Sequence, residues 1–168
     1  MTSIFKLLVA TFLTVAPLAV IAQSNVAHIN VQQLISEMPE VIAAQNELAK
    51  LEKDYTTQID NAFKEFQTKA QSYSSDAANQ TDVTNQARQK ELESMQTNLQ
   101  EFRDSAAQEL QKKQMDLMTP LLEKARNAIT KVGEEQGFNY VIDSSPNGGI
   151  ILANGKDLLA DVKKELGF

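Results

Sequence analysis

Apolar residues recur every three or four positions along two long stretches of the chain. The first stripe runs from Val41 to Tyr73, and the second runs from Leu92 to Val132. A narrow stripe with this spacing is typical of an α-helix that packs along a seam, as in a coiled coil. We therefore predict that residues 39–132 form two long helices.

The segment between the two stripes, residues 74–82, has no large apolar side chain and is rich in Ser, Asp and Asn, so the chain should reverse there. When the stripes are paired across this turn, the residue numbers of facing partners add up to 157 or 158. Ile59 then faces Leu99, and Leu48 faces Leu110. A constant sum is what an antiparallel hairpin requires. Residues 39–132 are therefore predicted to form a helical hairpin arm with its tip at about 74–83.

The rest of the chain, residues 23–38 and 133–168, is predicted to form a small body that contains β-strands. Short runs rich in Val, Ile and Tyr indicate strands at 26–30, 138–143 and 150–153, the last two joined by a turn. We expect Pro39 in the first turn of the first long helix, and a short separate helical turn at Val31–Glu37. A final helix is predicted from its N-cap, Asp157, to Gly167.

So small a body buries too little surface to support two long helices, and its strands would have open edges. We therefore predict a homo-oligomer whose strands pair or pack between chains. The fold class is mainly α with a small β body, from which a long antiparallel coiled-coil hairpin projects. The residues expected in the oligomeric body are Ile29, Val141, Ile142 and Ile151.

The N-terminus has the pattern of a secretory signal peptide. Lys6 precedes an apolar run from Leu7 to Ala22, which ends in small residues suited to cleavage before Gln23. The run is about 16 residues long, short of the ~20 that span a bilayer as a helix, so an uncleaved anchor is the less favoured alternative. We expect residues 1–22 to direct export.

Charge and composition exclude several classes of function. The formal net charge is −6, with 22 acidic and 16 basic residues, and loss of Lys6 would make it −7. Nucleic-acid binding is not expected, since phosphate contacts need clustered Lys and Arg. The chain has no cysteine, and its single histidine, His28, is interpreted as structural. We find no cofactor or metal signature and predict that the protein is not an enzyme.

A few soft or aromatic side chains on the arm are candidates for contact with unfolded clients. Methionine adapts its shape to varied partners, and Met115 lies off the apolar stripe. Phe63, Phe66 and Met95 are further candidates, although they also fit the hairpin seam and are explained by it alone.

The order of these elements resembles the Skp/OmpH family of periplasmic chaperones. The resemblance rests on the first strand at 26–30, the long hairpin, the strand that ends in Asp143, and the segment Asp157–Val162. It implies a homotrimer with a β-barrel body built from three chains. Three hairpin arms would then enclose unfolded outer membrane proteins without ATP, in the periplasm.

Known members of that family are strongly basic, with positively charged arm tips. Here residues 74–83 carry only Asp76 and Asp82. We therefore carry over no contact with membrane or lipopolysaccharide. The alternative function is that of a structural or adaptor coiled-coil protein of the cell envelope, with a specific folded partner.

Overall fold

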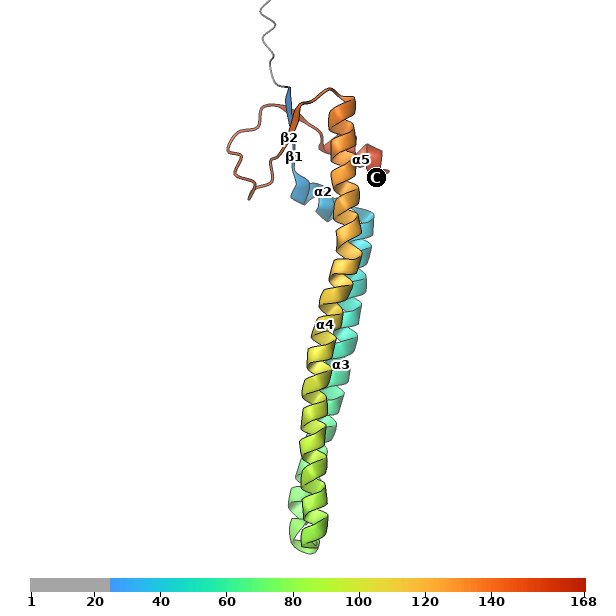
Figure 1. Cartoon of the computed structure of the whole chain (residues 1–168), viewed down its shortest axis with the longest axis vertical. Helices are drawn as coiled ribbons and strands as arrows, with labels where there is room; N and C mark the ends of the chain where they lie inside the picture. The colour runs from blue at the N-terminus through green and yellow to red at the C-terminus, as the bar shows by residue number, and fades with distance from the viewer. Residues whose placement is uncertain (1–24) are drawn as a thin grey trace, which may run out of the picture.

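The computed structural model describes residues 25–168, so the predicted signal peptide lies outside the described residues. Two long helices form an extended hairpin with a small body at one end (Figure 1). In chain order the elements are β1 (Val26–Ile29), α2 (Val31–Glu37), α3 (Pro39–Asp76), the 3-10 turn η1 (Ala77–Asn79), α4 (Asp82–Glu135), β2 (Tyr140–Asp143), β3 (Lys156–Asp157) and α5 (Leu159–Leu166).

The two helices of the hairpin run antiparallel, as predicted (Figure 1), and α4 extends to Glu135, beyond the predicted end at residue 132. α3 has 38 residues, which corresponds to a length of about 57 Å at 1.5 Å per residue. It begins with Pro39 in its first turn, where the missing backbone N–H costs nothing. The Thr81 side chain caps α4 by accepting a hydrogen bond from the backbone N–H of Thr84. The reversal takes only residues 77–81, which is shorter than the predicted tip.

The three strands form one parallel sheet in the order β2-β1-β3. β1 lies in the centre, with Ala27 beside Val141 on β2 and His28 beside Asp157 on β3. α2 follows β1 directly, because the Asn30 side chain caps it by accepting from the Gln33 N–H. This short helix spans the residues that the sequence predicted.

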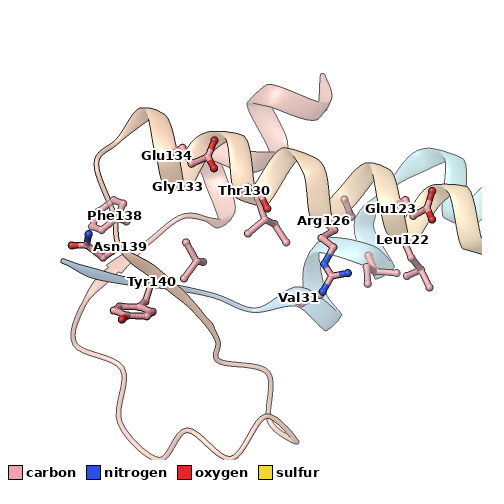
Figure 2. A pocket seen from close by; sticks show the side chains of 14 residues that line it. Val31, Leu122, Glu123, Arg126, Thr130, Gly133, Glu134, Phe138, Asn139 and Tyr140 are labelled. Atoms are coloured by element: carbon pink, nitrogen blue, oxygen red, sulfur yellow. The ribbon is translucent and has the colours of Figure 1, made fainter. Parts of the chain in front are cut away.

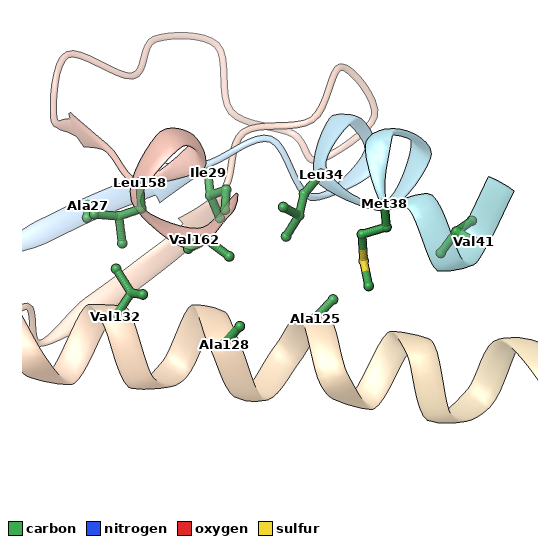
Figure 3. Close-up of a cluster of buried hydrophobic side chains, with 10 residues drawn as sticks. All are labelled: Ala27, Ile29, Leu34, Met38, Val41, Ala125, Ala128, Val132, Leu158 and Val162. Atoms are coloured by element: carbon green, nitrogen blue, oxygen red, sulfur yellow. The ribbon is translucent and has the colours of Figure 1, made fainter. Parts of the chain in front are cut away.

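The hydrophobic core lies where the sheet, α5 and α2 meet the base of the hairpin (Figure 3). Ala27 and Ile29 project from one face of β1 toward this core and are almost fully buried. Small residues of α4 allow close approach of the other elements. Burying each large aliphatic side chain contributes about 1.5–3 kcal/mol relative to leaving it exposed. The core residues are Ala27, Ile29, Leu34, Met38, Val41, Ala125, Ala128, Val132, Leu158 and Val162.

The predicted strand at 150–153 is wrong. Residues 144–155 form an irregular connection, and the third strand is the short β3 at Lys156–Asp157. The reason is topological: β2 and β3 both run parallel to β1, on opposite sides of it. The chain must therefore cross back over the sheet after β2, whereas a tight turn would have made an antiparallel pair. Ile151, expected to lie within this strand, is fully exposed on the connection.

The predicted N-cap of the last helix is displaced by one residue. Leu158 occupies the N-cap position of α5, while Asp157 belongs to β3. The Asp157 carboxylate nevertheless accepts a hydrogen bond from the Leu159 N–H at 2.9 Å, so it still helps to satisfy the start of the helix. Gly167 ends α5 in the left-handed conformation, with φ of +90°, as glycine allows.

Candidate functional site

The two helices of the arm are joined by polar contacts along their whole length, in a fixed register. The Tyr55 and Phe102 rings also meet edge to face, with centroids 6.1 Å apart. The residue numbers of these two add up to 157, the value predicted for the seam. In four polar pairs between the base and the tip, the two residue numbers add up to 164. This sum exceeds that of the apolar seam because long side chains reach residues further along the partner helix. These pairs are Glu40–Lys124, Tyr55–Glu109, Tyr73–Glu91 and Asp76–Arg88.

A cluster of polar side chains joins α3 to α4 just before the tip. This cluster, called the clasp below, consists of Lys69, Tyr73, Asp76, Arg88 and Glu91. The Arg88 guanidinium donates to Asp76 at 3.1 Å and lies over the Tyr73 ring, 4.7 Å from its centroid. Glu91 accepts hydrogen bonds of 2.6 Å from both Lys69 and Tyr73. Hydrogen bonds from Lys69 and Tyr73 lower the pKa of Glu91, and the bond to Glu91 raises the pKa of Tyr73.

The ion pair within the clasp also determines the charge at the surface of the tip. Hydrogen bonds from Asn79 and Arg88 lower the pKa of Asp76, which therefore stays ionised. Because Arg88 is paired with Asp76, its positive charge is neutralised locally. The tip therefore offers no concentrated positive surface to an anionic partner.

The four predicted client-contact residues are spread along the arm and do not form one cluster. Met115 and Phe63 are 54% and 40% exposed, whereas Phe66 and Met95 are half-buried in the seam. Phe66 and Met95 are therefore committed largely to holding the helices together. Met115 and Phe63 remain accessible to a partner.

An open apolar groove of about 630 Å³ lies at the base of the arm (Figure 2). One wall is the face of α4 that carries Leu122, Arg126 and Ile129, and Val31 on α2 and Tyr140 on β2 contribute to the others. Leu122 is 44% exposed although it is apolar. In the sequence, the apolar stripe widens at Leu122 and Ile129, a pattern that packing within the chain would also explain. Leu122, Arg126 and Ile129 are spaced by four and three residues and so lie on one face of α4. This spacing is the feature of the sequence that could have indicated the groove.

The residues predicted for the oligomeric body have different environments in the chain. Ile29 is 1% exposed and belongs to the core of a single chain. Val141 is half-buried and faces Gly133 of α4, where a Cβ atom would lie 2.8 Å from its Cγ2. Ile142 is 38% exposed and Ile151 is fully exposed. Only Ile142 and Ile151 therefore retain large free surfaces for another chain.

A polar network fixes the connection after β2 to the start of α2. Asp143 accepts hydrogen bonds from the Ser145 N–H at 2.9 Å and from the Val31 N–H at 3.3 Å. Ser145 is buried, and its hydroxyl accepts from the Gln32 N–H at 3.0 Å. Partial burial acts to raise the pKa of Asp143, but the hydrogen bonds from Ser145 and Val31 outweigh it and lower the pKa. These hydrogen bonds anchor the connection that follows β2, and this structural role explains them.

Within residues 25–168, no three His, Cys, Asp or Glu side chains come together in a group that could hold a metal ion. Over the same residues, no helix combines the length and the apolar character needed to cross a bilayer. The features that remain for function are the arm surface, the basal groove and the exposed apolar residues of the body.

Comparison with known proteins gives matches over almost the whole chain. The family model described as "Outer membrane protein (OmpH-like)" matches residues 25–166. The chain is 26% identical over 159 residues to a protein of Yersinia enterocolitica named "Chaperone protein Skp", with 92% of this chain and 93% of that protein covered. A protein of the same name from Pectobacterium atrosepticum is 21% identical over 151 residues, with 90% of each covered.

Proposed function

Because the chain belongs to the OmpH-like family of outer membrane proteins, we propose that it is a periplasmic chaperone that keeps unfolded outer membrane proteins soluble without ATP. The observation that carries this proposal is the long hairpin arm attached to a small body. The two relatives named as chaperones match 92% and 90% of this chain. Export through a cleaved signal peptide at residues 1–22 is part of the proposal.

The arm suggests how clients would be held. Its apolar residues are largely used in the seam between α3 and α4, and along the outer arm the large exposed apolar side chains are Phe63 and Val83. Such a surface binds an unfolded chain only weakly at each point. Several arms around one cavity would hold a client through many weak contacts at high effective concentration. The protein would therefore act as a holdase with broad specificity.

A cavity of this kind requires more than one chain, and the proposed assembly is a homotrimer. Its support is the apolar surface that a single chain leaves uncovered on the body. Tyr140, Ile142, Ile151 and Leu152 are 62%, 38%, 102% and 75% exposed. Large exposed apolar side chains on a small body are typical of an interface with another protein. We assign Ile142 and Ile151 to contacts in the assembled body.

The decisive experiment removes the outer arm and leaves the body intact. Residues 59–99 are replaced by a short Gly/Ser turn that joins Gln58 to Gln100, two positions whose numbers fit the seam register. The control variant carries the same turn in place of residues 77–81 only. We expect the truncated protein to assemble in solution with the same number of chains as the full-length protein. We also expect it to lose the ability to prevent aggregation of an unfolded outer membrane β-barrel protein.

The control should protect the client about as well as the original protein. If the truncated assembly protects the client equally well, the arms do not form the holding cavity. If the full-length protein never suppresses aggregation but binds one folded envelope protein, the adaptor function replaces the chaperone function.

A further inference from the structure

The single histidine of the chain lies on the sheet face that points away from the core. In β1, Ala27 and Ile29 are buried against the helices, so Val26 and His28 project from the opposite face. The parallel register places Ile142 of β2 beside His28. Figure 2 shows Tyr140, at the start of β2, pointing away from α4. His28 is therefore half-buried on an outer face formed mainly by apolar side chains.

The contacts of His28 in one chain are few and uncharged. Its Nδ1 lies 3.1 Å from the Ser144 hydroxyl, a contact that a neutral imidazole makes readily. On the other side, the Gly155 backbone approaches closely: a Cβ atom there would lie 3.8 Å from the His28 ring and 2.9 Å from the Val26 carbonyl oxygen. Water still reaches the ring, because His28 itself is only half-buried.

The charged groups on the neighbouring strands are already engaged in other contacts. Asp157, the register partner of His28 on β3, accepts a hydrogen bond from the Leu159 N–H. Lys156 forms an ion pair of 3.1 Å with Asp161. Asp143, at the end of β2, accepts from the Ser145 and Val31 N–H groups. None of these charges forms an ion pair with His28, so a protonated ring would be stabilised mainly by water.

We propose that His28 makes the assembly of the body sensitive to pH, because a second copy of the chain covers this sheet face and removes the water around the ring. The inference rests on the self-association proposed above. A second copy suits the face because the same chain offers an apolar segment, Ile150–Leu152, on the connection that starts at Ser144 beside His28. That segment is too exposed to cover the face of its own chain.

The direction of the effect follows from burial. Removal of water disfavours the charged form of a histidine, so the neutral form is the one that assembles. Acidification from about pH 7 to about pH 5.5 should therefore weaken assembly. The arm should stay folded, because its contacts depend on carboxylates whose pKa values are lowered.

The test uses the fact that the chain has one histidine. The association constant of the mature protein is measured by analytical ultracentrifugation at about pH 7 and about pH 5.5, at one ionic strength. His28→Phe cannot be protonated, and His28→Lys carries a charge at both pH values. Helicity measured by circular dichroism reports whether the arm of each variant is folded.

We expect the association constant of the original protein to fall by about tenfold or more at the lower pH, because burial disfavours the protonated ring. His28→Phe should stay assembled at both pH values, and His28→Lys should be dissociated at both with its arm folded. An original protein that assembles equally at both pH values overturns the inference but leaves the proposed function intact. A monomer at about pH 7 would overturn the proposed self-association as well.

Discussion

The ring of Tyr55 on α3 meets the ring of Phe102 on α4 edge to face, at 71° and with 6.1 Å between centroids. Aromatic pairs prefer this geometry because the positive edge of one ring faces the negative face of the other. The Tyr55 hydroxyl also donates to Glu109, almost two turns further along α4. Tyr55 thus fixes both the rotation of α3 about its axis and its axial position relative to α4.

The register of the hairpin leads to the first prediction. Cysteine pairs introduced at Leu48/Leu110 or at Ile59/Leu99 should form disulfides within one chain under mild oxidation, because each pair faces across the seam. The mismatched pair Leu48/Leu99 should not, since its members are separated by several turns of helix. Non-reducing electrophoresis of the purified monomer band distinguishes them. Efficient crosslinking of the mismatched pair would show that the helices slide.

Glu91 gives a prediction about acid stability. Its pKa is lowered from the ordinary value of 4.5 by hydrogen bonds from Lys69 and Tyr73, so its contribution is present above that value and is lost as the pH falls through the lowered pKa. Glu91→Gln should therefore lower the melting temperature at neutral pH, and the difference should disappear in strong acid. The matched control is Glu93→Gln, because the Glu93 side chain accepts a hydrogen bond from Gln89 on its own helix. Equal losses for both variants would exclude a special role for the clasp.

Gly133 gives a prediction about the junction of arm and body. A Cβ atom at this position would lie 2.8 Å from Cγ2 of Val141, whose branched side chain cannot easily turn aside. Gly133→Ala should therefore destabilise the protein by about 1–3 kcal/mol through overpacking. In a Val141→Ala background the same change should instead stabilise it by about 0.5–1 kcal/mol, because alanine favours the helix. Urea denaturation of the four proteins measures this coupling, and additive effects would contradict it.

The acidic surface predicts which clients bind best. With a formal net charge of −6, the protein should attract unfolded clients that are basic or neutral more strongly than acidic ones. Added salt should weaken binding to basic clients through screening. Fluorescence titration of one basic and one acidic unfolded β-barrel protein, at two salt concentrations, provides the comparison. Equal salt dependence for both clients would mean that long-range charge plays no part.

The arm could be predicted from the sequence because its structure depends on local rules. The signals are the helical spacing, the polar turn and Pro39 at a helix start. Each of them can be recognised from a few neighbouring residues. The constant sum of the residue numbers of facing partners then predicted which residues of the two distant helices pair. The short helical turn predicted at Val31–Glu37 is α2, and the structure shows that Asn30 caps it.

The sheet was harder to predict because its pairing is not local. Ile150–Ala153 has the composition of a strand, yet strand formation depends on an available partner edge in the correct direction. In the chain, both edges of β1 are taken by β2 and β3. The basal groove was missed for a related reason: the face of α4 around Leu122 is apolar, but only the tertiary structure shows that α2 and β2 leave it open.

The fixed pairing of α3 with α4 also restricts how this protein can evolve. An insertion in one helix alone would move every seam residue beyond it out of register with its partner. Arms of different length should therefore arise by matched insertions or deletions on both sides of the turn. Steps of about seven residues, or two helical turns, would preserve the seam best. The depth of any space enclosed by such arms would then change in discrete increments, while the turn at 77–81 and the body keep their lengths.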